Sequence, residues 1–323
     1  MLPSKLPLSS LHLPVFPGRA SCLLILLVAL VDLVWLGVTD ITLPAPQFLQ
    51  IMATLAVEVM LMRVLQRRLA AGSVHGRLFG TLAFLLKAII FLQLAWVLVR
   101  VFNHVSMASD FHYADRMLAD WDKFFGFDWQ AYFYFVQGHR LIHAILGLGY
   151  KSLSVCSVLA FCILVVRGEA RRTRFFLEIF LFTAVLCAAI GMFFPAKGSI
   201  ASFFGDAITW LNLGSLPGVY HLEHLYQLRS GLPFALDLYN LPGLVTFPSF
   251  HTAAAVVLAA SFWRTRLFPL MAAYAVVVIA STPVLGGHYF VDILAGTALA
   301  LLVSCAFGAL PGYRGLFGVT AAQ

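Results

Sequence analysis

The sequence predicts an all-α fold: a polytopic transmembrane helical bundle of about eight helices. Three observations lead to this prediction. Of the 323 residues, 61% are hydrophobic and only 11% are charged, whereas a soluble domain carries about a quarter charged residues. The hydrophobic residues occur in blocks of about 20, the length that crosses a bilayer. Basic residues gather in short segments between the blocks, as in oriented membrane proteins. This composition disfavours the alternative of a soluble helical core.

The eight helices are expected over residues 20–38, 48–65, 78–102, 141–166, 175–195, 249–263, 267–285 and 289–310. The first covers Ser21–Val38 and has no clear cleavage pattern, so we read it as a retained helix and not as a signal peptide. The last three are joined by very short loops and are therefore antiparallel neighbours. Residues 1–77 form a unit of N-terminal membrane helices, and 78–323 form the main membrane domain. Its extracytoplasmic loops are 103–140 and 196–247.

The basic residues predict the orientation of the chain. One side carries 13 of them: Lys5, Arg19, Arg63, Arg67, Arg68, Arg77, Arg167, Arg171, Arg172, Arg174, Arg264, Arg266 and Arg314. The other side carries five in longer loops: Arg116, Lys123, Arg140, Lys197 and Arg229. Short loops rich in Lys and Arg stay in the cytoplasm. Both termini are therefore predicted to be cytoplasmic, and the two long loops face the other side.

Charge and cysteine content exclude some classes of function. The net charge of +7 does not indicate nucleic-acid binding, because the basic residues are spread over the loops between spans. The five cysteines, Cys22, Cys156, Cys162, Cys187 and Cys305, all lie in apolar segments without metal-ligand spacing. They are read as small apolar side chains and not as disulfides or a zinc site.

The loop 103–140 alternates acids with aromatic residues. Its acids are Asp110, Asp115, Asp120, Asp122 and Asp128, and its aromatics include Trp121, Phe124, Phe125, Phe127 and Trp129. This pattern is typical of short amphipathic helices at the membrane interface. A lid that packs on the bundle explains it equally well.

Four charges, Asp32, Glu58, Lys87 and Lys151, fall near the middle of expected spans. Each costs about 2.5–3.5 kcal/mol at the bilayer centre unless it faces a partner inside the bundle. We expect a buried ion-pair cluster, and a polar path for a headgroup or a proton is the alternative.

Two motifs carry the chemistry. The first is Phe247-Pro248-Ser249-Phe250-His251-Thr252, and the second is Gly286-Gly287-His288-Tyr289-Phe290-Val291-Asp292. Each places a histidine where a helix starts, on the same side of the membrane. His288 and Asp292 are four residues apart and share a helix face, so the carboxylate can fix the imidazole tautomer. Helix N-termini attract anions, and histidine is an acid or base near neutral pH. A phosphate site is therefore predicted.

The two motifs resemble the second and third signatures of the type 2 phosphatidic acid phosphatase superfamily. They are closest to the branch that contains fungal inositol-phosphorylceramide synthase and bacterial relatives. Weaker similarity extends to Gly126-Phe127-Asp128-Trp129 and Tyr150. The resemblance implies a six-helix phosphatase-like core within 78–323 and a phosphohistidine mechanism. His288 would attack phosphorus, Asp292 would orient it, and His251 would protonate the leaving group.

The resemblance also implies cations for the phosphate. Phe194-Pro195-Ala196-Lys197-Gly198 and Leu228-Arg229-Ser230-Gly231 match the first signature, so Lys197 and Arg229 are expected to bind phosphate, with Ser249 as a hydroxyl donor. For these three residues the alternatives are a lysine that extends to the interface, a solvated arginine and a helix cap. Many members carry Ser-Arg six residues before the nucleophile. Here Ser281 is followed by Thr282, which favours the synthase-like branch.

No cofactor and no metal are expected. His221-Leu222-Glu223-His224 contains metal-ligand residue types, but no helical pattern is expected there. The predicted protein is an enzyme, a lipid phosphate phosphatase or phosphotransferase, at the non-cytoplasmic face of a multi-pass protein in a bacterial inner membrane. Its partners are a lipid phosphate substrate, membrane lipids and a lipid or sugar alcohol acceptor, without nucleic acid. A transporter and a vanadium-dependent peroxidase are the alternatives, and the absence of inverted repeats disfavours the transporter.

Overall fold

The computed structural model describes residues 17–70, 76–205 and 217–316. Lys5 and residues 206–216 of the second predicted loop lie outside the described residues. Within those ranges the regular secondary structure is helical apart from one pair of two-residue strands.

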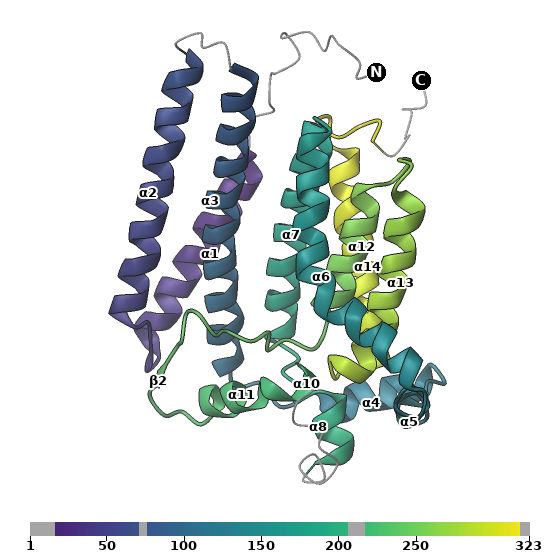
Figure 1. The fold of residues 1–323 in the computed structure, drawn as a ribbon. Helices are drawn as coiled ribbons and strands as arrows, with labels where there is room; N and C mark the ends of the chain where they lie inside the picture. The colour runs from purple at the N-terminus through teal and green to yellow at the C-terminus, as the bar shows by residue number, and fades with distance from the viewer. Residues whose placement is uncertain (1–16, 71–75, 206–216, 317–323) are drawn as a thin grey trace.

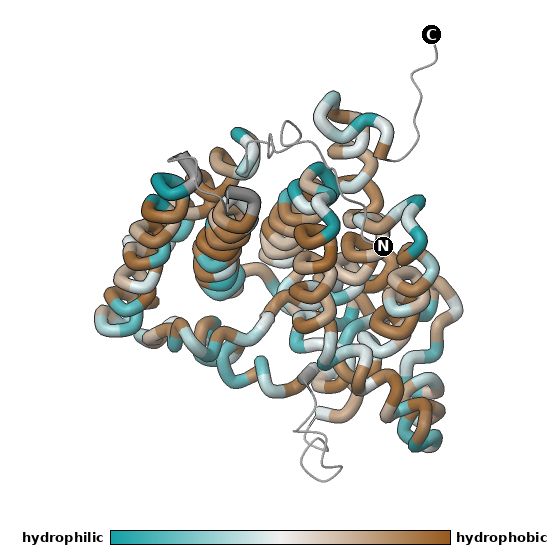
Figure 2. Tube along the Cα trace, turned by 45° about the horizontal axis from the view of Figure 1, so that its top comes forward, coloured by the Kyte–Doolittle hydropathy of each residue, from teal (hydrophilic) through white to brown (hydrophobic). Residues whose placement is uncertain are grey.

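Eight apolar helices build the bundle (Figure 1): α1 (Arg19–Val38), α2 (Ala45–Ala70), α3 (Gly76–Val105), α6 (Arg140–Val166), α7 (Ala170–Gly191), α12 (Phe250–Ser261), α13 (Phe268–Leu285) and α14 (Phe290–Ala309). In the described part of the chain, seven helices are long and apolar enough to cross a membrane, and α12 is shorter. Hydrophobic residues run along the helices and hydrophilic ones gather at their ends (Figure 2). The predicted all-α polytopic bundle is therefore confirmed.

The short helix α12 lies at the centre of the main bundle, where it contacts α6, α7, α13 and α14. Small side chains on this helix make the close packing possible. Ala253, Ala254 and Ala255 are all buried. Helices in membranes approach closely where such residues meet, because association there depends on packing contacts. With 12 residues, α12 is about 18 Å long, which is shorter than the hydrocarbon core of a bilayer, about 30 Å thick.

The first three helices form a separate layer beside this bundle. α2 packs on α3, and α3 in turn packs on α1 and α7 (Figure 1). A parallel pair of strands, β1 (Ile41–Thr42) and β2 (Phe234–Ala235), ties the turn between α1 and α2 to the second long loop. Neither strand was predicted, because two residues are too few to show an alternating pattern.

The boundaries of α7 differ from those predicted. The helix begins at Ala170 instead of residue 175 and ends at Gly191 instead of residue 195. Its first turn contains arginines that the charge pattern assigned to a loop. Arg172 pairs with Glu169 at 2.9 Å, and Arg174 pairs with the buried Glu178 at 3.0 Å. Paired in this way, basic residues are compatible with a helical turn.

The predicted ion-pair cluster among the four mid-span charges is wrong. Asp32 is buried, and neither of its carboxylate oxygens has a hydrogen-bond partner. Glu58 accepts a hydrogen bond from Gln93 at 2.8 Å, and Lys151 is exposed on α6. The ion pairs among the described residues join none of these four charges, so similar position along the spans did not pair them.

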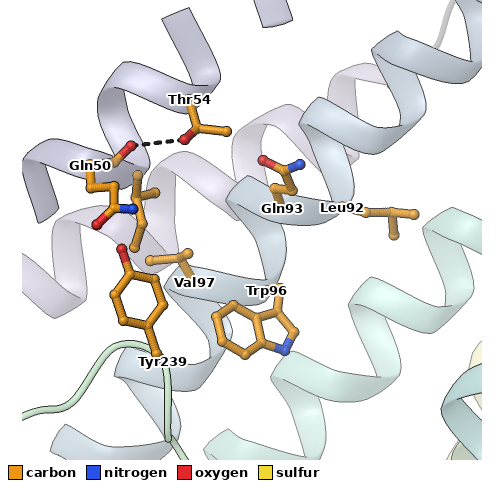
Figure 3. Close-up of a pocket in the computed structure, with 8 residues that line it drawn as sticks. Gln50, Thr54, Leu92, Gln93, Trp96, Val97 and Tyr239 are labelled. Atoms are coloured by element: carbon orange, nitrogen blue, oxygen red, sulfur yellow. Dashed lines mark hydrogen bonds between the residues drawn. The ribbon is translucent and has the colours of Figure 1, made fainter. Parts of the chain in front are cut away.

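A cavity of roughly 500 Å³ opens between α2 and α3 (Figure 3). It is lined by Gln50, Ile51, Thr54, Leu92, Gln93, Trp96, Val97 and Tyr239. Tyr239 comes from the loop after β2 and lies beside Gln50 in the figure. No residue of the two histidine motifs lines this cavity, so it is not the candidate active site.

Five short helices cover one end of the bundle: α4 (Asp115–Phe124), α5 (Trp129–Gly138), α8 (Ser199–Phe204), α10 (Pro217–Tyr220) and α11 (Leu222–Arg229). A 3-10 turn, η2 (Ser106–Ala108), precedes them. On α4 the acids Asp115 and Asp122 are buried, whereas Phe124 is 82% exposed. The helix is amphipathic as expected, but it packs on the bundle through its acidic side and exposes aromatic side chains.

Candidate active site

The first motif begins α12. Ser249 is the N-cap, and its hydroxyl accepts a hydrogen bond from the amide of Thr252 at 3.4 Å. The Ser249 amide donates to the carbonyl of Asp292 at 3.0 Å, which joins the start of α12 to the start of α14. Gly296 permits this contact, because a Cβ atom there would lie 2.4 Å from the Ser249 carbonyl oxygen. The N-termini of the two helices therefore lie together.

The second motif forms a histidine–carboxylate pair. Nδ1 of His288 lies 3.3 Å from Oδ2 of Asp292. The same oxygen accepts a hydrogen bond from the amide of Tyr289 at 2.9 Å, as in a capping box. Burial lowers the pKa of His288 to about 4, because a low-dielectric environment disfavours the charged form. At neutral pH His288 is an uncharged imidazole whose Nδ1 is oriented by Asp292.

His251 faces His288 across a short gap. The centroids of the two rings are 6.3 Å apart and their planes differ by 59°. Tyr150 of α6 stacks on the His251 ring, with a centroid distance of 4.4 Å. Both imidazoles can reach one small group at hydrogen-bonding distance. The structure thus brings the two predicted histidines together, with Asp292 and Ser249 next to them.

The outer helices hold the His288 loop from outside the bundle. On α4, the two carboxylate oxygens of Asp122 accept hydrogen bonds from the amides of Phe290 at 2.8 Å and Val291 at 2.9 Å. On α5, Nε1 of Trp129 donates to the carbonyl of His288 at 3.0 Å. Burial raises the pKa of Asp122 to about 6, and the two amides oppose this rise. A side chain from a distant segment therefore caps the helix that follows the histidine.

Asp115 connects α4 to two more segments of the site. It accepts hydrogen bonds from the amide of Lys197 at 2.9 Å, the amide of Gly198 at 3.0 Å and the hydroxyl of Tyr289 at 2.9 Å. Burial is the largest cause that raises the pKa of Asp115. Asp115 and Asp122 are seven residues apart, which places them on one face of a helix. This seven-residue spacing is the signal in the sequence that indicates a shared face for the two carboxylates.

Glycines let three backbone segments meet around His288. Gly198 has φ +92°, a conformation rare for other residues, and a Cβ atom there would lie 2.8 Å from the Gly287 carbonyl oxygen. A Cβ atom at Gly218 would lie 2.4 Å from the Gly287 amide nitrogen. Ser199 donates from its amide to the Gly287 carbonyl at 2.8 Å. Larger residues at these glycines would force the segments apart.

A family model described as the PAP2 superfamily matches residues 116–306. The chain belongs to the PAP2 superfamily. Members of this superfamily are phosphatases and phosphotransferases, so the protein is an enzyme of that kind with membrane-spanning helices. The match runs from α4 through α14 and includes both histidine motifs and Asp122. The comparisons with curated proteins and with solved structures found no match.

The two cations expected to bind phosphate in this PAP2 protein lie together around Tyr113. Nζ of Lys197 is 5.1 Å from the Tyr113 ring centroid, and the Arg229 guanidinium is 4.5 Å from it. Arg229 also donates to the carbonyls of Ser109 at 2.8 Å and Phe111 at 2.5 Å. Much of its donor capacity therefore holds the loop after η2. The structure places Lys197 one residue from the Gly198 contact with the His288 loop.

Arg100 is a cation within the predicted span 78–102 that was not predicted as a site residue. Its guanidinium donates to the carbonyl of Leu241, lies 5.6 Å from the centroid of the Trp96 ring, and interacts electrostatically with His251. Arg100 is therefore a cation of α3 whose charge acts on His251. The sequence does not predict this interaction, because Arg100 lies in an apolar helix and nothing in the sequence relates α3 to α12.

The two histidines of the segment His221–His224 have different surroundings. The structure has a helix, α11, over Leu222–Arg229, where the sequence predicted none. The His224 ring packs 5.6 Å from that of His104, whereas His221 bonds to the backbone of Lys197. Over the described ranges, no group of three or more potential metal ligands occurs.

Proposed function

We propose that the protein is an integral-membrane phosphatase or phosphotransferase that acts on a lipid-linked phosphate through a phosphohistidine intermediate. The observation that carries the proposal is the His288–Asp292 pair, which faces His251 at 6.3 Å between ring centroids. Both histidines lie at the ends of membrane helices, the depth at which a lipid headgroup resides. The membership in the PAP2 superfamily supports the same chemistry.

The first half-reaction transfers the phosphoryl group to the enzyme. The lone pair of His288 Nε2 attacks phosphorus, the bond from phosphorus to the leaving oxygen breaks, and His251 donates a proton to that oxygen. Asp292 stabilises the positive charge that develops on His288. Charge on the phosphoryl oxygens needs fixed donors. Lys197, the first-turn amides of α12 and Ser249 are the candidates, with Arg229 more distant because of its backbone contacts.

The second half-reaction releases the phosphoryl group. His251 removes a proton from water or an alcohol, the oxygen attacks phosphorus, and the bond to His288 breaks. Water gives a phosphatase, and an alcohol gives a headgroup transferase similar to inositol-phosphorylceramide synthase. Two observations favour the transferase. His288 is only 4% exposed under the outer helices, which limits access of water to the intermediate, and Thr282 stands where many members have arginine.

We further propose that the site faces the periplasm or cell exterior of a bacterium and that both chain ends are cytoplasmic. The basic loops lie at the opposite end of the bundle from α4, α5, α8 and α11 (Figure 1). The excess of basic residues in those short loops supports this orientation.

The test is an assay of purified protein in liposomes without added metal. The panel contains lipid phosphates, diphosphates and phosphodiesters, with and without alcohol acceptors, and His288→Ala is measured beside the parent. The variant is expected to lose turnover entirely, because no covalent intermediate can form. Free phosphate from the parent alone would identify a phosphatase, and an acceptor-dependent phosphodiester would identify a transferase. Activity that survives in His288→Ala would refute the phosphohistidine mechanism.

A further inference from the structure

A third imidazole lies near His288 of the proposed mechanism. His221 precedes α11 and is 4% exposed. Its ring forms a hydrogen bond with the backbone of Lys197, and this bond raises its pKa, as donation to a carbonyl does. Its Nε2 atom is buried and has no hydrogen-bond partner. The proton is therefore on Nδ1, and Nε2 presents a free lone pair.

The backbone fixes this imidazole against the His288 loop. The segment that carries His221 meets that loop at Gly218, whose carbonyl oxygen would lie 3.0 Å from a Cβ atom on Gly287. On the other side, Lys197 is held by Asp115, which also bonds to Tyr289. Both neighbours of His221 are thus connected to the residues that flank His288.

Burial favours the uncharged form of His221. Burial is the largest cause that lowers its pKa, to about 4, and the nearby His288 contributes in the same direction. A neutral imidazole with Nδ1 protonated can only accept at Nε2. Buried acceptors without a partner are rare, because each loses its hydrogen bond to water. A hydroxyl group of a bound substrate is a donor that this acceptor can pair with.

We infer that Nε2 of His221 accepts a hydrogen bond from a hydroxyl group of the bound substrates and so selects for hydroxyl-bearing molecules. The inference rests on the proposed function and deepens it. Phosphate oxygens are excluded as the partner when ionised, because they have no proton to donate. The hydroxyl belongs either to the headgroup of the donor lipid or to the incoming alcohol, and the test separates these sources.

The test compares four proteins: the parent, His221→Phe, His221→Gln and the control His224→Phe. Phenylalanine keeps a flat ring without an acceptor, and glutamine restores an acceptor. His224 lies one turn further along the chain and packs against His104 and Phe234, away from the His288 loop. The probes are phosphonate lipids with a glycerol or inositol headgroup and the same lipids with every headgroup hydroxyl methylated. Binding is measured by thermal shift and titration, so no turnover is needed.

If the donor headgroup supplies the hydroxyl, the parent binds the hydroxylated phosphonates about 10-fold tighter than the methylated ones. This is the ratio of dissociation constants that one ordinary hydrogen bond produces. This preference is lost in His221→Phe, partly restored in His221→Gln and unchanged in His224→Phe. If the acceptor supplies it, the phosphonates show no such preference. Instead, His221→Phe lowers the ratio of transfer to hydrolysis with glycerol as acceptor, while consumption of the donor lipid persists.

Two results would overturn the inference. One is that the parent binds hydroxylated and methylated lipids equally well and that His221→Phe leaves the ratio of transfer to hydrolysis unchanged. The other is that His221→Phe lowers the affinity for all lipids by the same factor, which would indicate a structural role. Failure of the proposed function looks different, because the parent would then turn over no lipid whatever its binding preference.

Discussion

His251 and His288 have different surroundings, and these support different roles. Tyr150 stacks on His251, whereas His288 is bonded through Nδ1 to a carboxylate. We predict that His251→Ala lowers kcat by about 10²–10⁴-fold, the usual contribution of general acid–base help. For a substrate with an activated phenol leaving group, the loss of kcat should be smaller, because the phenolate departs without a proton. Steady-state kinetics on both substrates checks this, and equal losses would contradict His251 as the acid.

The buried position of His288 predicts an unusual pH profile. Because the pKa of His288 is lowered to about 4, the imidazole is uncharged above pH 4. The reactive uncharged form is lost by protonation only as the pH falls through this pKa. The acid limb of kcat/KM for a phosphodiester substrate, which does not titrate in this range, should lie near pH 4. An exposed histidine would give a limb near 6.5.

The measurement is kcat/KM from pH 3.5 to 8 in liposomes. The pKa of Asp122 near 6 is a second titration in this range, and Asp122→Asn removes it as a control. A limb near 6.5 that persists in Asp122→Asn would show that water reaches His288.

Local spacing revealed some site residues and not others. His288 and Asp292 could be paired from the sequence because i and i+4 positions share a helix face. The capping of α14 by Asp122 could not, since the partners are separated by 168 residues. Arg229 was chosen by motif, but its guanidinium is largely occupied by backbone carbonyls. Sequence spacing carries no information on such long-range bonds.

At the scale of elements, α4 acts as a brace for the start of α14. We predict that Asp122→Ala lowers the free energy of unfolding by about 1–3 kcal/mol, since two buried amides lose their acceptor. The His288 loop would also be held less firmly, so kcat should fall more than KM changes. Thermal unfolding in detergent and steady-state kinetics are the measurements.

Asp120→Ala is the matched control for this brace. Asp120 lies on the same helix, has a side chain that is 57% exposed, and pairs with Lys123 at 3.1 Å. Exposed ion pairs contribute about 0–1 kcal/mol, so this variant should resemble the parent. If Asp122→Ala behaves like Asp120→Ala, the brace has no role in catalysis.

The long helices were predictable because each is an apolar block with a length set by the bilayer. The expected 141–166 and 267–285 agree with α6 and α13 to within one residue. The short helices α8, α10 and α11 were not predicted. They have 4–8 residues, too few to show helical periodicity, and their contacts with other segments define them.

At the scale of the whole molecule, the proposed orientation can be tested by cysteine labelling. In a variant without the five native cysteines, Ser230→Cys reports the end with the short helices and Gly312→Cys the end with the basic loops. Both positions are exposed. In intact cells, a membrane-impermeant maleimide should label Ser230→Cys and not Gly312→Cys, because the basic loops stay inside.

Permeabilised cells provide the control for access, since both cysteines should then react. The reverse pattern in intact cells would place the histidines on the cytoplasmic side. That outcome would leave the chemistry of the site unchanged but would require a substrate from the inner leaflet.

The bond from Trp129 to the carbonyl of His288 has an optical consequence. Trp129 is only 2% exposed, and its indole is bonded to the backbone of the proposed nucleophile. Indole emission shifts to the red when the ring becomes hydrated. A displacement of the loop during a reaction cycle would therefore change the fluorescence of the native protein. Once the other five tryptophans are replaced, the chain contains its own unlabelled sensor of loop movement.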